Sequence, residues 1–246
     1  MPAAARDPVA LPALLPLGLD GVLVRFGTTF TEEGNRAARA FAAEAAALDG
    51  VTEVVPAPAS VLLRLDPREQ PAAQVQSAAR ALLDSHDWLS LPAAPAARCW
   101  HLPVSFAKAD APDLPEVARI TGLPEADVVT RILAERPRVL AIGFAPGQPY
   151  LGQLPPVFDL PRRAQLQDVP AGALTLAIRQ MVLFSNASPT GWMQIGRAAF
   201  RPFQPDATDP MPLRTGDEIR FHAIPDGELK ALGEDPMGGA RLEILS

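Results

Sequence analysis

Six side chains that could bind a small polar ligand lie among glycine and proline turns in the second half of the chain. They are Tyr150, Arg162, Gln180, Ser188, Trp192 and Arg197. Arginine suits a carboxylate, while glutamine and serine suit an amide carbonyl. Each residue also has an ordinary structural alternative, such as an aromatic ring in the core or an arginine that faces water. Because rigid loops at strand ends often present binding residues, we expect the six to line one small pocket for an amide-bearing substrate.

The stretch GFAPGQPYLGQLPP, residues 143–156, predicts a rigid turn beside that pocket. Gly143 and Gly147 permit tight backbone turns, whereas Pro146 and Pro149 restrict the backbone. We expect this loop to hold Tyr150, the single tyrosine of the chain, at the rim of a cleft with little entropy lost on binding. The other turn residues expected to shape the pocket are Pro170, Gly172, Gly191 and Gly196.

Several common catalytic sites have no matching motif. The sequence contains no phosphate-binding P-loop, no dinucleotide-binding glycine motif and no G-x-S-x-G nucleophile elbow. His86, His101 and His222 are far apart and lack metal-ligand spacing, so no metal site and no bound cofactor are predicted. His101 is interpreted as a strand histidine bonded to backbone, with a carboxylate partner as the alternative. Cys99 is interpreted as a buried small hydrophobic residue.

The composition favours a globular protein of one large or two small domains. The 246 residues are 48% hydrophobic and 20% charged. A net charge of −6, with no basic cluster longer than Arg162-Arg163, argues against a nucleic-acid partner. A single cysteine excludes an internal disulfide and suits the cytoplasm. Residues 1–21 are interpreted as a flexible lead-in to the first strand and not as an export signal, and no apolar run is long enough to span a membrane.

The first half of the chain predicts alternating strands and helices. Strands are expected over 21–27, 51–57 and 60–66, with helices over 31–50 and about 70–88. Thr31 is the predicted N-cap of the first helix, and Gly50 its predicted end. Residues 98–106 are a candidate closing strand, after a linker over 89–98. The β-α-β-β-α order is typical of a split βαβ, ferredoxin-like domain.

The second half begins with two short predicted helices and continues as strands. Asp113 to Glu116 forms a capping-box start, Gly122 ends that helix, and Pro124 opens the next. Strands are then expected over 138–144, 173–178, 181–185, 191–200 and 217–224, with a further candidate over 240–245. Short strands at this spacing favour a barrel or a sandwich.

Several motifs together resemble a known family. They are NRAARAFAAEAAALDGVTEVVPAPASVLLRLDP (35–67), GFAPGQPYLGQL, LPRR (160–163), VPAGALTLA (169–177), SPTGWMQIGRA (188–198) and LRTGDEIRF (213–221). In order and approximate spacing they are similar to the B subunit of 5-oxoprolinase, also called allophanate hydrolase subunit 1, a family that includes a sporulation-kinase inhibitor. The resemblance runs from about Gly18 to Ile224. One departure is SFAKAD, residues 105–110, where the family usually carries Tyr-Gly-Gly-Glu.

The resemblance implies an α+β chain with a ferredoxin-like domain over 18–92, a cyclophilin-like β-barrel over 98–226 and a tail over 227–246. The tail resembles the first strand of a companion domain, and a stray terminal strand is the alternative. The implied function is that of one subunit of an ATP-dependent amide or lactam hydrolase. A companion cyclophilin-like subunit, separate or fused downstream, and a third, lactam-opening subunit would be its partners, and ATP would be used by a partner. The alternative is a non-catalytic regulator, such as a histidine-kinase inhibitor.

Overall fold

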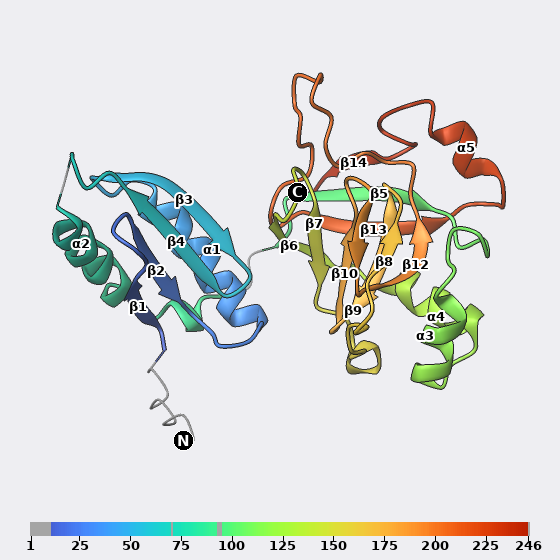
Figure 1. The fold of residues 1–246 in the computed structure, drawn as a ribbon, viewed down its shortest axis with the longest axis horizontal. Coiled ribbons are helices and arrows are strands. Elements are labelled where there is room, and N and C mark those ends of the chain that lie inside the picture. Colours follow the sequence, from blue (N-terminus) through green and yellow to red (C-terminus); the bar gives the residue numbers. More distant parts are fainter. Residues whose placement is uncertain (1–10, 70, 93–94, 246) are drawn as a thin grey trace. The chain divides into compact units, whose positions relative to one another are not determined.

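The computed structural model describes residues 11–69, 71–92 and 95–245. Residues 1–10 of the predicted lead-in over 1–21 and the predicted start of the second helix at residue 70 lie outside these ranges. The chain divides into two compact units, Met1–Ala94 and Pro95–Ser246, which Figure 1 shows and which are described separately. None of the helices in the described ranges has both the length and the apolar character needed to cross a lipid bilayer.

The first unit is an antiparallel sheet covered on one face by helices. The sheet has the order β1-β2-β4-β3, with β1 Ala13–Pro16, β2 Gly21–Arg25, β4 Ser60–Leu65 and β3 Val51–Ala57. Alternate apolar residues of these strands face α1 (Glu32–Ala45), α2 (Ala72–Asp84) and the short helix η1 (Trp88–Ser90). Phe41 of α1 meets the edge of the Trp88 ring at a centroid distance of 5.4 Å, so these elements share one core.

Three details of the first unit differ from the sequence predictions or refine them. The fourth strand of the sheet is β1, which pairs with β2, so the prediction of a flexible lead-in was wrong for residues 13–16. The candidate strand over 98–106 lies in the second unit. Thr31 caps α1 as predicted, accepting a 3.0 Å hydrogen bond from the Gly34 amide. However, α1 ends at Ala45 because the Ala47 and Leu48 amides bond to carbonyls three residues back, and Gly50 adopts φ +80° only after this turn.

The second unit is built on an eight-stranded sheet that curls back on itself. Its order is β12-β9-β10-β7-β6-β13-β5-β14. The strands are β5 Arg98–Val104, β6 Arg138–Ile142, β7 Pro149–Gly152, β9 Ala173–Ala177, β10 Gln180–Leu183, β12 Met193–Arg197, β13 Glu218–Ala223 and β14 Arg241–Ile244. Arg197 of the edge strand β12 forms a bridge to Ser105, just after β5. The edge strand β12 therefore closes onto the end of β5, the neighbour of the other edge strand β14. This closure is typical of a barrel, one of the two architectures that the strand-rich sequence favours.

The main core of this unit fills the inner face of the curled sheet. Leu102, Leu151 and Leu176 are fully buried there. Helices α3 (Leu114–Thr121) and α4 (Glu125–Ala134) pack against this core and against each other (Figure 1). A two-stranded sheet of β8 (Gln167–Val169) and β11 (Ser188–Thr190), the short helix η2 (Pro156–Phe158) and helix α5 (Glu228–Leu232) complete the unit.

The start of α3 is a further correction. Asp113 is the N-cap residue, but its carboxylate makes no capping hydrogen bond. It accepts instead from the Arg163 guanidinium at 2.8 Å and from the Gln194 amide at 2.7 Å. A partly buried charged partner thus outcompetes the local capping-box arrangement. The predicted end of the helix at Gly122, with φ +69°, is confirmed.

Candidate functional site

A cavity of about 570 Å³ lies beside the end of β12 in the second unit. Its wall consists of Asp110, Ala171, Gly172, Ser185, Arg197, Ala198, Ala199, Phe200, Arg201, Gly227, Leu229, Lys230 and Gly233. Three of these side chains are cationic, Arg197, Arg201 and Lys230, and Asp110 is the one carboxylate among them. The described wall therefore carries more positive than negative charge, which favours an anionic ligand group.

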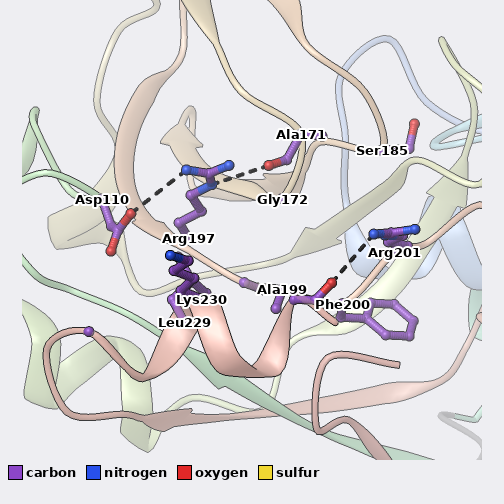
Figure 2. Close-up of a pocket in the computed structure, with 13 residues that line it drawn as sticks. Asp110, Ala171, Gly172, Ser185, Arg197, Ala199, Phe200, Arg201, Leu229 and Lys230 are labelled. Carbon is purple, nitrogen blue, oxygen red and sulfur yellow. Dashed lines mark hydrogen bonds and ion pairs between the residues drawn. The ribbon is translucent and has the colours of Figure 1, made fainter. Parts of the chain in front are cut away.

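Arg197 is held at the cavity by two weak contacts and stays available to a ligand. Its Nε donates to the Ala171 carbonyl at 3.4 Å, and its Nη1 lies 4.0 Å from the Asp110 carboxylate. Figure 2 shows the guanidinium pointing toward both groups. The side chain remains 41% exposed. Both distances are long for charge-assisted contacts, so a carboxylate ligand could replace them with shorter ones.

Asp110 is positioned by buried neighbours. The fully buried Ser105 donates its hydroxyl to the Asp110 carboxylate at 2.6 Å. The Gln194 side chain donates to the Asp110 carbonyl at 2.8 Å. Ser105 and Arg197 also exchange both backbone hydrogen bonds, at 2.8 and 2.9 Å. The acid and the arginine are therefore fixed relative to each other by the same strand contact that closes the sheet.

Gly172 lets the opposite wall approach this strand contact. Its φ is +78°, and an added Cβ would lie 2.1 Å from the Ala198 carbonyl oxygen. The Ala198 amide donates to the Gly172 carbonyl at 2.8 Å. A side chain at this position would push the turn over Pro170–Ala173 away from β12. The predicted structural role of Gly172 thus has a specific cause at the cavity wall.

The remaining cations come from the segment that follows β12 and from α5. The Arg201 guanidinium donates to the Gly233 carbonyl at 3.4 Å, and its backbone amide donates to the Pro236 carbonyl at 3.0 Å. Lys230 lies in α5 and lines the same cavity. Sequence reasoning missed Arg201, Lys230 and Asp110. Of the three, only Asp110 could have been noticed in the sequence, because it lies in SFAKAD, the segment that departs from the family pattern.

The predicted aromatic residues lie together, but outside this cavity wall. Tyr150 and Trp192 meet edge to face with ring centroids 6.2 Å apart. They pack with Val182 and Phe184 in a small second core. Gln180, 7% exposed, opens β10 opposite Gly152. Because paired residues of an antiparallel sheet share a face, Gln180, Val182 and Tyr150 lie on the same side.

The other predicted residues lie on separate elements: Arg162 follows η2, Ser188 begins β11 and Arg197 ends β12. Arg197 lines the cavity, Arg162 is exposed, and the Ser188 hydroxyl accepts a 3.1 Å hydrogen bond from the Asn186 side chain. The predicted loop joins β6 to β7: Gly143 and Pro146 lie in the turn, Gly147 adopts φ +69° there, and Pro149 begins β7. Of the other turn residues, Pro170 lies two residues before Gly172. A Cβ added to Gly191 would clash with the Arg163 backbone, and one added to Gly196 would clash with the Val104 side chain. Binding roles for Tyr150, Arg162, Gln180, Ser188 and Trp192 stay predictions.

Comparison with known proteins places the chain in a family. The model of the carboxyltransferase domain, subdomain C and D, matches residues 12–213. This chain belongs to that family, which includes the B subunit of 5-oxoprolinase. The family predicted from the sequence motifs is thereby confirmed.

Three similar proteins show which share of a relative's length this chain matches. The chain is 39% identical to the 5-oxoprolinase B subunit of Escherichia coli O157:H7 over 128 residues, which are 52% of this chain and 59% of that protein. It is 28% identical to the 5-oxoprolinase B subunit of Bacillus subtilis (strain 168) over 236 residues, 89% of this chain and 95% of that protein. The solved structure of TTHA0988 superimposes with a TM-score of 0.70 at 32% identity, covering 83% of this chain and 40% of that chain. The matches thus span less than two thirds of the Escherichia coli protein and of TTHA0988.

The cavity of this family member has the chemistry of a binding site. Its guanidinium and ammonium groups can hold a carboxylate, and Asp110 can accept a hydrogen bond from a ligand N–H. The described wall residues include neither histidine nor cysteine, so they form no nucleophile and base pair of that kind. The arrangement can orient and neutralise a small acid.

Proposed function

We propose that this chain is one subunit of an ATP-dependent amide or lactam hydrolase complex of the 5-oxoprolinase or allophanate hydrolase type. It would bind the substrate carboxylate in the cavity beside Arg197. The observation that carries the proposal is that Arg197, Arg201 and Lys230, with one fixed carboxylate, line the same cavity in a member of this family. 5-Oxoproline has both groups that such a site needs, a carboxylate and a ring amide N–H.

The assembly is part of the proposal. A companion cyclophilin-like subunit, separate or fused downstream, would complete the site. A third, lactam-opening subunit would use ATP, and the complex would work in the cytoplasm. The sheet order β1-β2-β4-β3 supports a ferredoxin-like first unit. The bridge between Ser105 and Arg197 supports a cyclophilin-like barrel in the second.

The test is substrate turnover by the reconstituted complex. The chain is co-expressed with its companion subunits, and ATP-dependent release of glutamate from 5-oxoproline is measured, with allophanate as a second substrate. Arg197→Ala is expected to lower kcat/KM about 10- to 100-fold because a charged hydrogen bond to the carboxylate is lost. Arg119→Ala is the matched control, since Arg119 pairs on the surface with Glu116 of the same helix.

A ligand comparison separates the carboxylate contact from a general loss of activity. 2-Pyrrolidinone has the ring amide of 5-oxoproline without its carboxylate, so its weak binding should be the same in the parent chain and in Arg197→Ala. Equal kcat/KM for 5-oxoproline in both chains would remove Arg197 from the site. If neither 5-oxoproline nor allophanate is hydrolysed by the parent complex, the enzyme proposal fails. That result would favour the alternative, a non-catalytic regulator.

A further inference from the structure

Four side chains with metal-binding atoms gather on the outer face of the second unit, away from the cavity described above. Cys99 and His101 lie on β5, His222 on β13 and Glu243 on β14. One ligand atom each from Cys99, His101 and Glu243 lies within 4.8 Å of the other two. His101 Nδ1 lies 2.9 Å from His222 Nε2, and its Nε2 lies 2.8 Å from the Glu243 carboxylate. We call these four residues the outer-face cluster.

The sheet register explains why residues so distant in sequence meet. Cys99 and His101 are two residues apart on one strand and therefore point to the same face. Glu243 is paired directly with Cys99 across β14. His222 lies on the parallel neighbour β13, paired with Pro103. The neighbours of Cys99 and His101 on β5, Trp100 and Leu102, belong to the inner core, so the cluster faces outward.

From this geometry we infer that the outer-face cluster is a zinc site. Its ligands are Cys99 Sγ, His101 Nε2 and a Glu243 carboxylate oxygen, with the fourth position open to water. Thiolate, imidazole and carboxylate are the ligand types that zinc takes in proteins. His222 acts as the outer partner, accepting the hydrogen on Nδ1 of His101 and so fixing the tautomer that leaves Nε2 free to bind metal.

The observed spacing is close to that of a zinc site, and metal binding would replace the contact of the buried Cys99 thiol with the Glu218 carboxylate, 3.7 Å away. In a tetrahedral zinc site, ligand atoms lie about 3.3–3.6 Å apart, as follows from Zn–N and Zn–S bonds of about 2.0 and 2.3 Å. The 2.8 Å contact between His101 and Glu243 would open slightly to admit the ion. The widest separation among the three ligand atoms, at most 4.8 Å, would shrink by about 1 Å.

The arginines around the outer-face cluster are partly neutralised by a carboxylate. Arg220, paired with His101 across the two strands, has its Nε 3.5 Å from the Glu218 carboxylate. Arg136 lies 3.9 Å from the same carboxylate, while Arg241 is paired with His101 on the other side. Glu218 therefore offsets part of this positive charge. A Cys99 thiolate together with Glu243 supplies two negative charges against the two positive charges of the ion.

Metal binding would fasten β14 to the rest of the sheet. All four residues of β14 are exposed, and Ile244 is 71% exposed. The strand therefore buries little apolar surface, and its attachment rests largely on edge pairing with β5. A metal that links Glu243 to Cys99 and His101 adds a bond across this pairing.

The test uses cobalt as a spectroscopic probe of the full chain. Because Cys99 is the single cysteine of the sequence, any thiolate-to-cobalt charge-transfer band reports on this residue alone. Titration with CoCl₂ should give such a band that saturates at one equivalent per chain. Adding ZnCl₂ should bleach it. Hydrogen exchange of the β14 amides should slow when zinc is bound.

Variants distinguish the cluster from a single reactive thiol. Glu243→Gln and His101→Gln should each weaken cobalt binding by at least about tenfold, since each removes a ligand. His222→Ala should weaken it about 10- to 100-fold but keep the band at saturation, as expected of an outer partner. His86→Ala is the matched control and should bind like the parent chain, because His86 lies in the first unit.

Three results would overturn the inference. One is the absence of a charge-transfer band in the folded parent chain. Another is an unchanged cobalt affinity in Glu243→Gln, whose side chain is exposed and whose replacement leaves the core intact. The third is a stoichiometry of one ion per two chains together with dimerisation in sedimentation, which would assign the metal to a contact between copies.

Discussion

At the scale of single residues, Gly172 determines whether the cavity wall can form. Its backbone adopts φ +78°, and a Cβ there would meet the Ala198 carbonyl oxygen at 2.1 Å. The left-handed backbone and the close contact both result from the path of the turn over Pro170–Ala173. This turn must approach the end of β12 to close the wall around Arg197. Gly143, in the predicted Tyr150 loop, has no such constraint: an added Cβ would have nothing within 4 Å.

These two glycines make a matched prediction. Gly172→Ala should lower the free energy of unfolding by more than about 1 kcal/mol. A left-handed backbone alone costs alanine about 1–3 kcal/mol, and the clash adds to this cost. Gly143→Ala should change it by no more than about 0.5 kcal/mol. Urea unfolding of the two variants measures both values. Equal stability of the two variants would contradict this description of the wall.

At the scale of elements, α3 is joined to the sheet through Asp113. The carboxylate accepts from Arg163 and from the backbone amide of Gln194, and the Asp113 amide donates to the Gln194 carbonyl at 3.0 Å. The Asp113 side chain is 13% exposed and that of Arg163 24%. The start of the helix, the chain after η2 and strand β12 thus meet at one ion pair.

Removing this carboxylate should cost more than removing an ordinary first-turn acid. Asp113→Ala is expected to destabilise the chain by about 3 kcal/mol, because the partly buried Arg163 loses its acidic partner. Asp127→Ala, an exposed first-turn acid of α4, should cost less than about 1 kcal/mol. Thermal unfolding of both variants checks the difference. A loss as small in Asp113→Ala as in Asp127→Ala would show that the ion pair is not stabilising.

Element types were predictable from local patterns, whereas their partners were not. Thr31 as a cap and Gly122 as a helix end follow from short-range chemistry, and the structure has both. The partner of Asp113 lies 50 residues further along the chain, so no capping-box pattern could indicate it. In the same way, His101 and His222 meet through a parallel pairing of β5 with β13, which their spacing in sequence could not reveal.

At the scale of the whole molecule, the two units have separate cores. The core of the first unit is formed by residues from Val22 to Trp88, and the main core of the second by residues from Trp100 to Ala240. A compact unit with its own core can fold without its neighbour. The second unit contains both the cavity beside Arg197 and the outer-face cluster.

A fragment of residues 95–246 should therefore fold cooperatively on its own. Its thermal unfolding should give a single transition, and its amide spectrum should overlay that of the second unit in the full chain. A fragment of residues 1–94 is the counterpart, with Trp88 fluorescence as the probe. If the longer fragment is molten or insoluble, the second unit depends on the first for its stability.

Strand β5 is the first strand of the second unit, yet its neighbours, β13 and β14, are the last two strands described. During synthesis, more than a hundred residues follow β5 before β13 or β14 leaves the ribosome. Trp100, Leu102 and Val104 remain without these strand partners throughout that interval. Pairing between such distant segments is slow to form and open to wrong partners. Nascent chains of this unit should therefore rely on chaperones until their final strands emerge.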